Sequence, residues 1–86
     1  MRYSGLKKVS VEDLEEWRKT IWGCRISAAL TIEEMAKKLG IPAFRLDKIE
    51  KAAQPATEAL ADLALEISGG DRWDDTEDYT KYLSEK

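Results

Sequence analysis

Two short helical patterns lie next to each other in the middle of the sequence, and their spacing constrains the fold more than any other feature. The first begins with a capping box, in which Thr31 and Glu34 each satisfy the other's free backbone amide. It ends at Gly40, which readily adopts the left-handed conformation of a helix end. The second begins at Pro42, where a missing amide proton costs nothing, and runs to about Ala52. Two helices joined this tightly have to cross at a steep angle.

The residues around the turn have the sizes that such a crossing needs. Ala36 is small enough for the two helices to touch, and Gly40 is flexible enough for the corner. Leu46 and Ile49 form an inner stripe that holds the second helix down. The sequence therefore predicts a helix-turn-helix unit.

A long helix is predicted before this unit, from Val11 to Ser27. Ser10 is a suitable N-cap, and the carboxylate of Asp13 favours the positive end of the helix. Apolar residues three and four positions apart define its inner face, and these are Val11, Leu14, Trp17, Ile21, Cys24 and Ala28.

Two more helices are predicted after the unit. One opens at Ala56 or Thr57 and ends before Gly69. The other is short and carries Tyr79, Tyr82 and Leu83 on one side. Because no alternating strand pattern is present, we expect an all-α bundle of four to five helices. We divide the chain into a loose N-terminal arm (1–9), the helix-turn-helix domain (10–70) and an acidic C-terminal helical extension (71–86).

Composition argues against several classes of function. The 86 residues include no histidine and a single cysteine, Cys24, so we expect no internal disulfide and no zinc site, and we place Cys24 in the core. No pair of acidic residues stands in a recognisable acid–base setting, so we expect neither an enzyme nor a cofactor. No apolar run approaches the roughly 20 residues of a membrane span, and we expect a cytoplasmic protein that does not bind membranes.

The charge of the chain is unevenly distributed. The net charge is −3, which disfavours non-specific binding to nucleic acids. Residues 1–30 carry six Lys/Arg against four Asp/Glu, whereas residues 71–86 carry three against six. The acidity is therefore concentrated toward the C-terminus.

The segment from Ile21 to Ile67 resembles the Cro and Xre-type helix-turn-helix family, which includes phage repressors, bacterial regulators and antitoxins. Residues 30–41 (LTIEEMAKKLGI) are similar to the second helix and turn of that family. Residues 45–51 (RLDKIEK) are similar to its third helix, and Pro55, Leu60 and Leu63 fall where its fourth helix lies. The resemblance implies a lambda-repressor-like fold.

The resemblance also implies a transcriptional regulator that binds double-stranded DNA as a homodimer. In this family the third helix lies in the major groove, and the start of the second helix meets the DNA backbone. The residues that would face bases are Ala43, Phe44, Arg45, Asp47 and Lys48. The residues that would contact phosphates are Arg25, Thr31, Lys37, Lys38 and Lys51.

A second hypothesis is that the same scaffold recognises a protein, as small phage inhibitors and antitoxins do. Ile32, Phe44 and Asp47 are poor DNA ligands, and the acidic C-terminal segment could bind a partner. Phe44 has two interpretations, a core residue or an exposed contact, and we favour the core.

The aromatic residues also leave two alternatives open. Trp17 and Trp22 are five positions apart and cannot share one helix face, so we expect Trp17 in the core and Trp22 near an edge. One alternative is a dimer interface or partner site formed by Trp22, Trp73, Tyr79 and Tyr82. The other, which we favour, is that Trp73 and the final helix simply cap the core.

Overall fold

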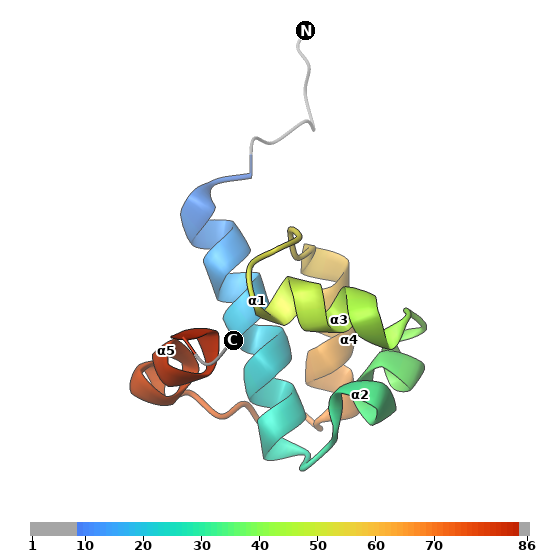
Figure 1. The fold of residues 1–86 in the computed structure, drawn as a ribbon. Helices are drawn as coiled ribbons and strands as arrows, with labels where there is room; N and C mark the ends of the chain where they lie inside the picture. The colour runs from blue at the N-terminus through green and yellow to red at the C-terminus, as the bar shows by residue number, and fades with distance from the viewer. Residues whose placement is uncertain (1–8, 85–86) are drawn as a thin grey trace, which may run out of the picture.

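A computed structural model describes residues 9–84 of the chain, and the predicted all-helical fold is confirmed for this range. No strand occurs within it. Figure 1 shows the five helices, which are α1 (Val11–Ser27), α2 (Ile32–Leu39), α3 (Ala43–Glu50), α4 (Glu58–Ile67) and α5 (Thr76–Ser84). The N-terminal arm was predicted for residues 1–9, and all of it except Val9 lies outside the described residues.

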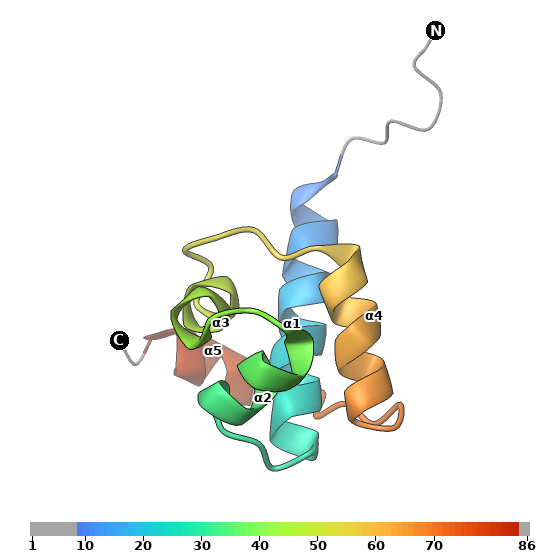
Figure 2. The same ribbon diagram turned by 90° about the vertical axis from the view of Figure 1, so that its right-hand side faces the viewer.

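The longest helix, α1, runs through the middle of the molecule. Figures 1 and 2 show α4 beside it on one side, running in the same direction, and α5 on the other side. The α2 and α3 helices pack across α1 and α4. The core between these helices consists of buried residues of α1 to α4 and of the loop before α4, which are Ile21, Cys24, Met35, Ala36, Leu39, Leu46, Ile49, Ala56, Ala61 and Ala64.

Local side-chain chemistry explains where the helices begin. The hydroxyl of Ser10 accepts a hydrogen bond from the amide of Asp13 at 3.0 Å, and the hydroxyl of Thr57 caps α4 in the same way. Both halves of the predicted capping box at Thr31 and Glu34 are present. The predicted starts of α1, α2 and α4 are therefore correct to within a residue or two.

The third helix is shorter than predicted. It ends at Glu50, with Lys51 as its C-cap, instead of continuing to Ala52. Ala52 adopts a left-handed conformation with φ of 67°. Pro42 is the N-cap of α3 and not its first helical residue.

The burial of α1 differs from the prediction at two positions, Val11 and Trp22. Val11 is 70% exposed, because the first turn of α1 extends beyond the helices that pack against its middle. Trp22 is only 4% exposed, whereas Trp17 is partly buried against the core. The placement of Trp22 near an edge was wrong, since α5 covers a second face of α1.

Aromatic contacts fix this second interface. The ring of Trp22 lies 5.1 Å from that of Tyr79 and 6.1 Å from that of Tyr82, measured between centroids. Tyr79 is 7% exposed. The final helix therefore caps the bundle, as we favoured, whereas Trp73, which we expected to cap it as well, is 45% exposed. Within the described residues, no helix has the length and apolar character needed to cross a membrane.

Candidate nucleic-acid interface

The turn between α2 and α3 is built as the sequence predicted. Gly40 has φ of 77°, in the left-handed region that glycine adopts without strain. The amide of Ile41 donates to the carbonyl of Ala36 at 3.0 Å, which closes the end of α2. Ala36 is 2% exposed and Leu46 is fully buried, so the two helices are locked together at the turn.

The outer side of α3 carries the residues predicted to face bases. Arg45 and Lys48 are exposed, and Asp47 and Ala43 are half-buried. Phe44 is 66% exposed, so our preference for a core position was wrong. The core side of α3 is already filled by Leu46, Ile49 and Glu50, which leaves no room for another large side chain there.

A shallow hollow lies between the start of α2 and the start of α3. It is lined by Ile32 and Glu33 from α2 and by Ala43, Phe44 and Asp47 from α3. Its walls combine apolar surface with two carboxylates. Next to it, the Lys48 ammonium lies 5.9 Å from the centre of the Phe44 ring, which is within the range of a cation–π contact.

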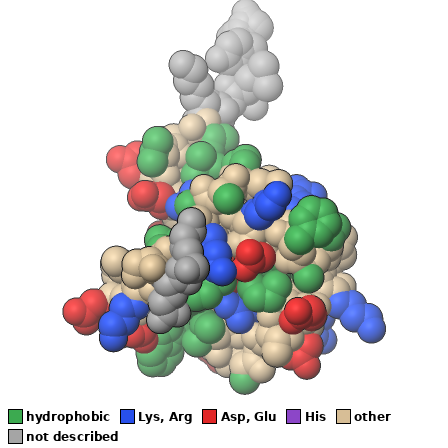
Figure 3. Space-filling model, viewed as in Figure 1, with side chains coloured by type: hydrophobic (Ala, Val, Ile, Leu, Met, Phe, Trp, Pro, Cys, Tyr) green, Lys and Arg blue, Asp and Glu red, His purple; other side chains and the backbone are tan. Residues whose placement is uncertain are grey.

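The charge of this region differs from that of the whole chain. From Thr31 to Lys51, the residues outside the core include five basic side chains (Lys37, Lys38, Arg45, Lys48 and Lys51) and three acidic ones (Glu33, Glu34 and Asp47). The local balance is therefore +5 − 3 = +2, against −3 for the chain. In Figure 3, blue and red side chains are interspersed around α2 and α3. The surface is mildly basic and has no continuous basic stripe on the face shown.

Among the other predicted phosphate contacts, Thr31, Lys37 and Lys38 are exposed and Lys51 is half-buried. Lys37 and Lys38 are exposed at the end of α2. Thr31 is exposed, but its hydroxyl accepts from the amide of Glu34 at 3.1 Å. The ammonium of Lys51 lies 3.2 Å from the Asp47 carboxylate, one helical turn away. This pair reduces the positive charge that Lys51 offers to a phosphate.

Arg25 was predicted to contact phosphates, and the structure contradicts this. Its side chain is buried and donates to both carboxylate oxygens of Glu50, from Nε at 2.8 Å and from Nη2 at 2.9 Å. A third bond runs from Nη1 to the carbonyl of Leu30 at 3.1 Å. Arg25 therefore ties α1 to α3 inside the protein and is not available to DNA.

Glu50 is held by the final helix as well. The Tyr82 hydroxyl donates to its carboxylate at 3.0 Å, and the Tyr79 hydroxyl donates to its backbone carbonyl at 2.9 Å. Burial raises the pKa of the Glu50 carboxyl above its ordinary value, while the bonds from Arg25 and Tyr82 oppose that rise. Glu50 thus joins α1, α3 and α5 at one point.

The predicted aromatic partner site is only partly accessible. Trp22 and Tyr79 are buried, so neither can form a surface contact, and Tyr82 is half-buried against Glu50. Trp73 is 45% exposed. These four residues do lie near one another, but Trp22, Tyr79 and Tyr82 pack inside the protein and stabilise the fold.

Sequence reasoning missed Glu50 and Gly23. Glu50 follows Ile49 and lies one turn after Leu46, so the spacing of the inner stripe could have placed it facing the core. Gly23 lies in the interior of α1, where a glycine normally destabilises a helix. A glycine at such a position could have indicated a close contact with another segment. The carbonyl of Gly23 accepts from the amide of Trp73 at 2.9 Å.

Comparison of the chain with protein family models, with curated proteins and with solved structures found no match. Among the described residues, no group of three or more potential metal ligands comes together.

Proposed function

We propose that this chain is a helix-turn-helix protein of the Cro/Xre type, which regulates transcription by placing α3 in the major groove of double-stranded DNA. The observation that carries the proposal is the position of Arg45 and Lys48. Both are exposed on α3, while the opposite side of the helix is fixed by Leu46, Ile49 and the buried carboxylate of Glu50. A rigid helix that presents two cationic side chains fits the dimensions of the major groove.

The types of side chain on α2 and α3 suit different contacts with DNA. Arginine and lysine pair well with guanine and with phosphates, and Phe44 and Ala43 can pack against the methyl groups of thymine. Lys37 and Lys38 add positive charge at the end of α2. The local balance of +2 (five basic and three acidic side chains) lets this face approach DNA although the chain is acidic.

We include a homodimer in this proposal, acting in the cytoplasm. One helix in one groove supplies limited specificity, and a two-fold dimer would read two half-sites about 34–36 Å apart. Selection of bound duplexes from a random-sequence pool tests both ideas. Recovery of a sequence repeated at that spacing supports them, and a pool that shows no enrichment at low salt removes the proposal.

The second candidate function is protein recognition by the same face. The observation that favours it is the large exposed area of Phe44 beside Ile32, with Glu33 and Asp47 in the same hollow. An exposed aromatic side chain with mixed charges around it is typical of protein interfaces. Affinity capture with wild-type and Phe44→Ala protein tests this candidate, since protein binding would depend mainly on Phe44, whereas DNA binding would depend mainly on Arg45 and Lys48. Retention of every captured protein by the variant would count against it.

A further inference from the structure

Trp73 is held in place by hydrogen bonds although nearly half of it is exposed. Its side chain is 45% exposed, so much of its apolar surface is not buried by the fold. Its backbone amide nevertheless donates to the carbonyl of Gly23 at 2.9 Å, and its indole N–H donates to the carboxylate of Asp78 at 3.1 Å. An exposed tryptophan with both its backbone and its ring fixed is preorganised for contact with another molecule.

Gly23 allows this arrangement. A Cβ atom at position 23 would fall inside the contact distance of the Trp73 carbonyl oxygen and of the Arg72 side chain. Arg72 donates to Glu16, to Thr20 and to Asp74, and Lys19 pairs with Asp74 at 3.0 Å. The segment that carries Trp73 is therefore attached to α1 on both sides of the tryptophan.

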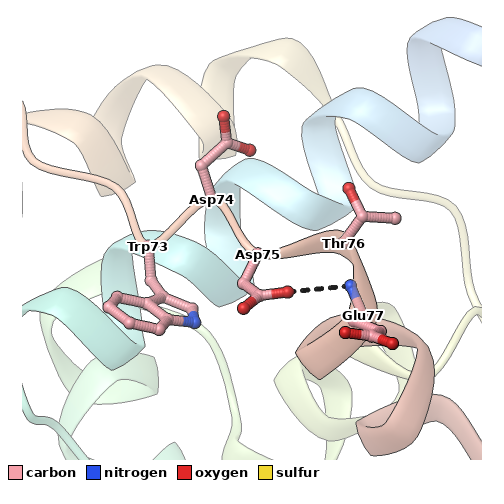
Figure 4. Close-up of a pocket in the computed structure, with 5 residues that line it drawn as sticks. All are labelled: Trp73, Asp74, Asp75, Thr76 and Glu77. Atoms are coloured by element: carbon pink, nitrogen blue, oxygen red, sulfur yellow. Dashed lines mark hydrogen bonds between the residues drawn. The ribbon is translucent and has the colours of Figure 1, made fainter.

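Trp73 lies between two hollows in the surface. One is lined by residues 73–77, and Figure 4 shows the Trp73 ring, Asp75 and Glu77 on the same side of this segment. Asp74 and Thr76 point to the opposite side. The other hollow lies toward the end of α1 and includes Ile26 and Lys81, along with Trp22 and Tyr82.

The surroundings of Trp73 are strongly acidic. Residues 71–84 carry five acidic side chains and two basic ones, a balance of 2 − 5 = −3. One of the two basic residues, Arg72, is already paired with Glu16 and Asp74. The bond from Lys19 and the charge of Arg72 lower the pKa of Asp74 below its ordinary value.

The Asp78 carboxylate lies against the indole edge, and the carboxylates of Asp75 and Glu77 line the adjoining hollow, where one Asp75 oxygen accepts from the amides of Glu77 and Asp78. Carboxylates around an aromatic ring are complementary to a cation.

We propose that Trp73, Asp75 and Glu77 form a docking site for an arginine side chain in a basic segment of a protein partner. A guanidinium stacks on the indole ring and at the same time pairs with carboxylates at its edge. Charge complementarity selects this occupant, because a nucleic acid or a second copy of the same acidic face would be repelled. The site is separate from α3, so it does not depend on the proposed binding of DNA.

The experiment titrates the isotopically labelled full-length chain with a capped Gly-Arg-Gly-Arg-Gly peptide and follows amide and indole signals by NMR. A peptide with citrulline in place of arginine has the same shape without the charge. Trp73→Ala removes the ring, and Glu77→Gln removes a carboxylate whose oxygens make no hydrogen bond within residues 9–84. Glu66→Gln, at an exposed position on α4, is the matched control for charge.

The expected result is a shift of the Trp73 indole signal and of residues 73–78 with the arginine peptide alone. Trp73→Ala and Glu77→Gln should each weaken the binding about two- to fivefold, the range of an exposed cation–π contact or ion pair, and Glu66→Gln should not. Equal shifts with the citrulline peptide overturn the proposal, as does equal weakening by Glu66→Gln and Glu77→Gln. Sedimentation that shows self-association dependent on Trp73 also overturns it, because a second copy would then be the occupant.

Discussion

Arg25 and Glu50 form a bidentate ion pair inside the protein, with N–O distances of 2.8 and 2.9 Å, although the two residues come from different helices. Glu50 is fully buried and Arg25 is 8% exposed. The pair fixes the end of α3 on α1, and Tyr82 from α5 donates to the same carboxylate. The orientation of the proposed recognition helix therefore depends on a charged contact in the core.

Removing only one partner of the Arg25–Glu50 pair should strongly destabilise the protein. We expect Glu50→Ala to lower the free energy of unfolding by about 3–5 kcal/mol, because it leaves the Arg25 charge buried without a partner. The double variant Arg25→Met, Glu50→Leu should be more stable than Glu50→Ala, since it removes both charges and retains volume. Urea unfolding followed by circular dichroism measures both. A double variant less stable than the single one would contradict this account.

Substitution of Gly23 by alanine should change the stability of the protein in the direction opposite to that usual for a glycine in a helix. In an unconstrained helix, glycine to alanine stabilises by about 1 kcal/mol. Here we expect Gly23→Ala to destabilise by about 1–3 kcal/mol, because the new methyl group would collide with the backbone of Trp73. Thermal unfolding measures the change, with the exposed Ser27→Ala as a control in the same helix. A stabilised Gly23→Ala protein would show that the Trp73 segment is not attached there.

Stability should decline in alkaline solution because of the tyrosines on α5. Burial raises the pKa of Tyr79 from 10.0 to about 12. The neutral phenol is therefore favoured in the folded protein, and its contribution is complete below pH 10 and is lost as the pH rises from 10 to about 12. The contribution is about 1–3 kcal/mol, because one pKa unit corresponds to about 1.4 kcal/mol.

The measurement is urea unfolding at a series of pH values from neutral to alkaline. Tyr79→Phe should be less stable than wild type near neutral pH, since it loses the bond to the Glu50 carbonyl, and should decline less above pH 10. Tyr82 also has a raised pKa through burial and the nearby charge of Glu50, so some decline will remain in this variant. Parallel curves for the two proteins would rule out a role for Tyr79.

Phe44 should separate function from stability. Because its side chain is 66% exposed, we expect Phe44→Ala to change the free energy of unfolding by less than about 0.5 kcal/mol. On a selected DNA site, the same change should weaken binding by about three- to tenfold through the lost apolar contact. Parallel unfolding and binding measurements test this. A strongly destabilised variant would mean that Phe44 packs against the protein.

The sequence predicted those parts of the fold that depend on neighbouring residues. Capping at Ser10 and Thr31 and the left-handed Gly40 are local, so the bounds of α1 and the turn after α2 could be predicted. The burial of Trp22 could not, because it requires knowing that a helix more than 50 positions later packs on that face. Helical periodicity gives one inner face, whereas α1 has two.

Prediction of the candidate site was limited in the same way. Arg45 and Lys48 are exposed because local spacing keeps them off the inner stripe formed by Leu46 and Ile49. Arg25 was predicted to be free to contact DNA, because no residue near it in the sequence indicates that it pairs with a carboxylate 25 positions away. Contacts between distant segments decide which charges are free for a ligand.

The most direct test of the central claim is DNA binding by fluorescence anisotropy, with a labelled duplex from the selection, at about 50 and about 200 mM salt. Arg45→Ala and Lys81→Ala each remove one exposed positive charge, the first from α3 and the second from α5. The account predicts salt-sensitive binding that Arg45→Ala weakens by about tenfold or more, while Lys81→Ala leaves it nearly unchanged. Absence of saturable binding at the lower salt concentration, or equal loss in both variants, would contradict it.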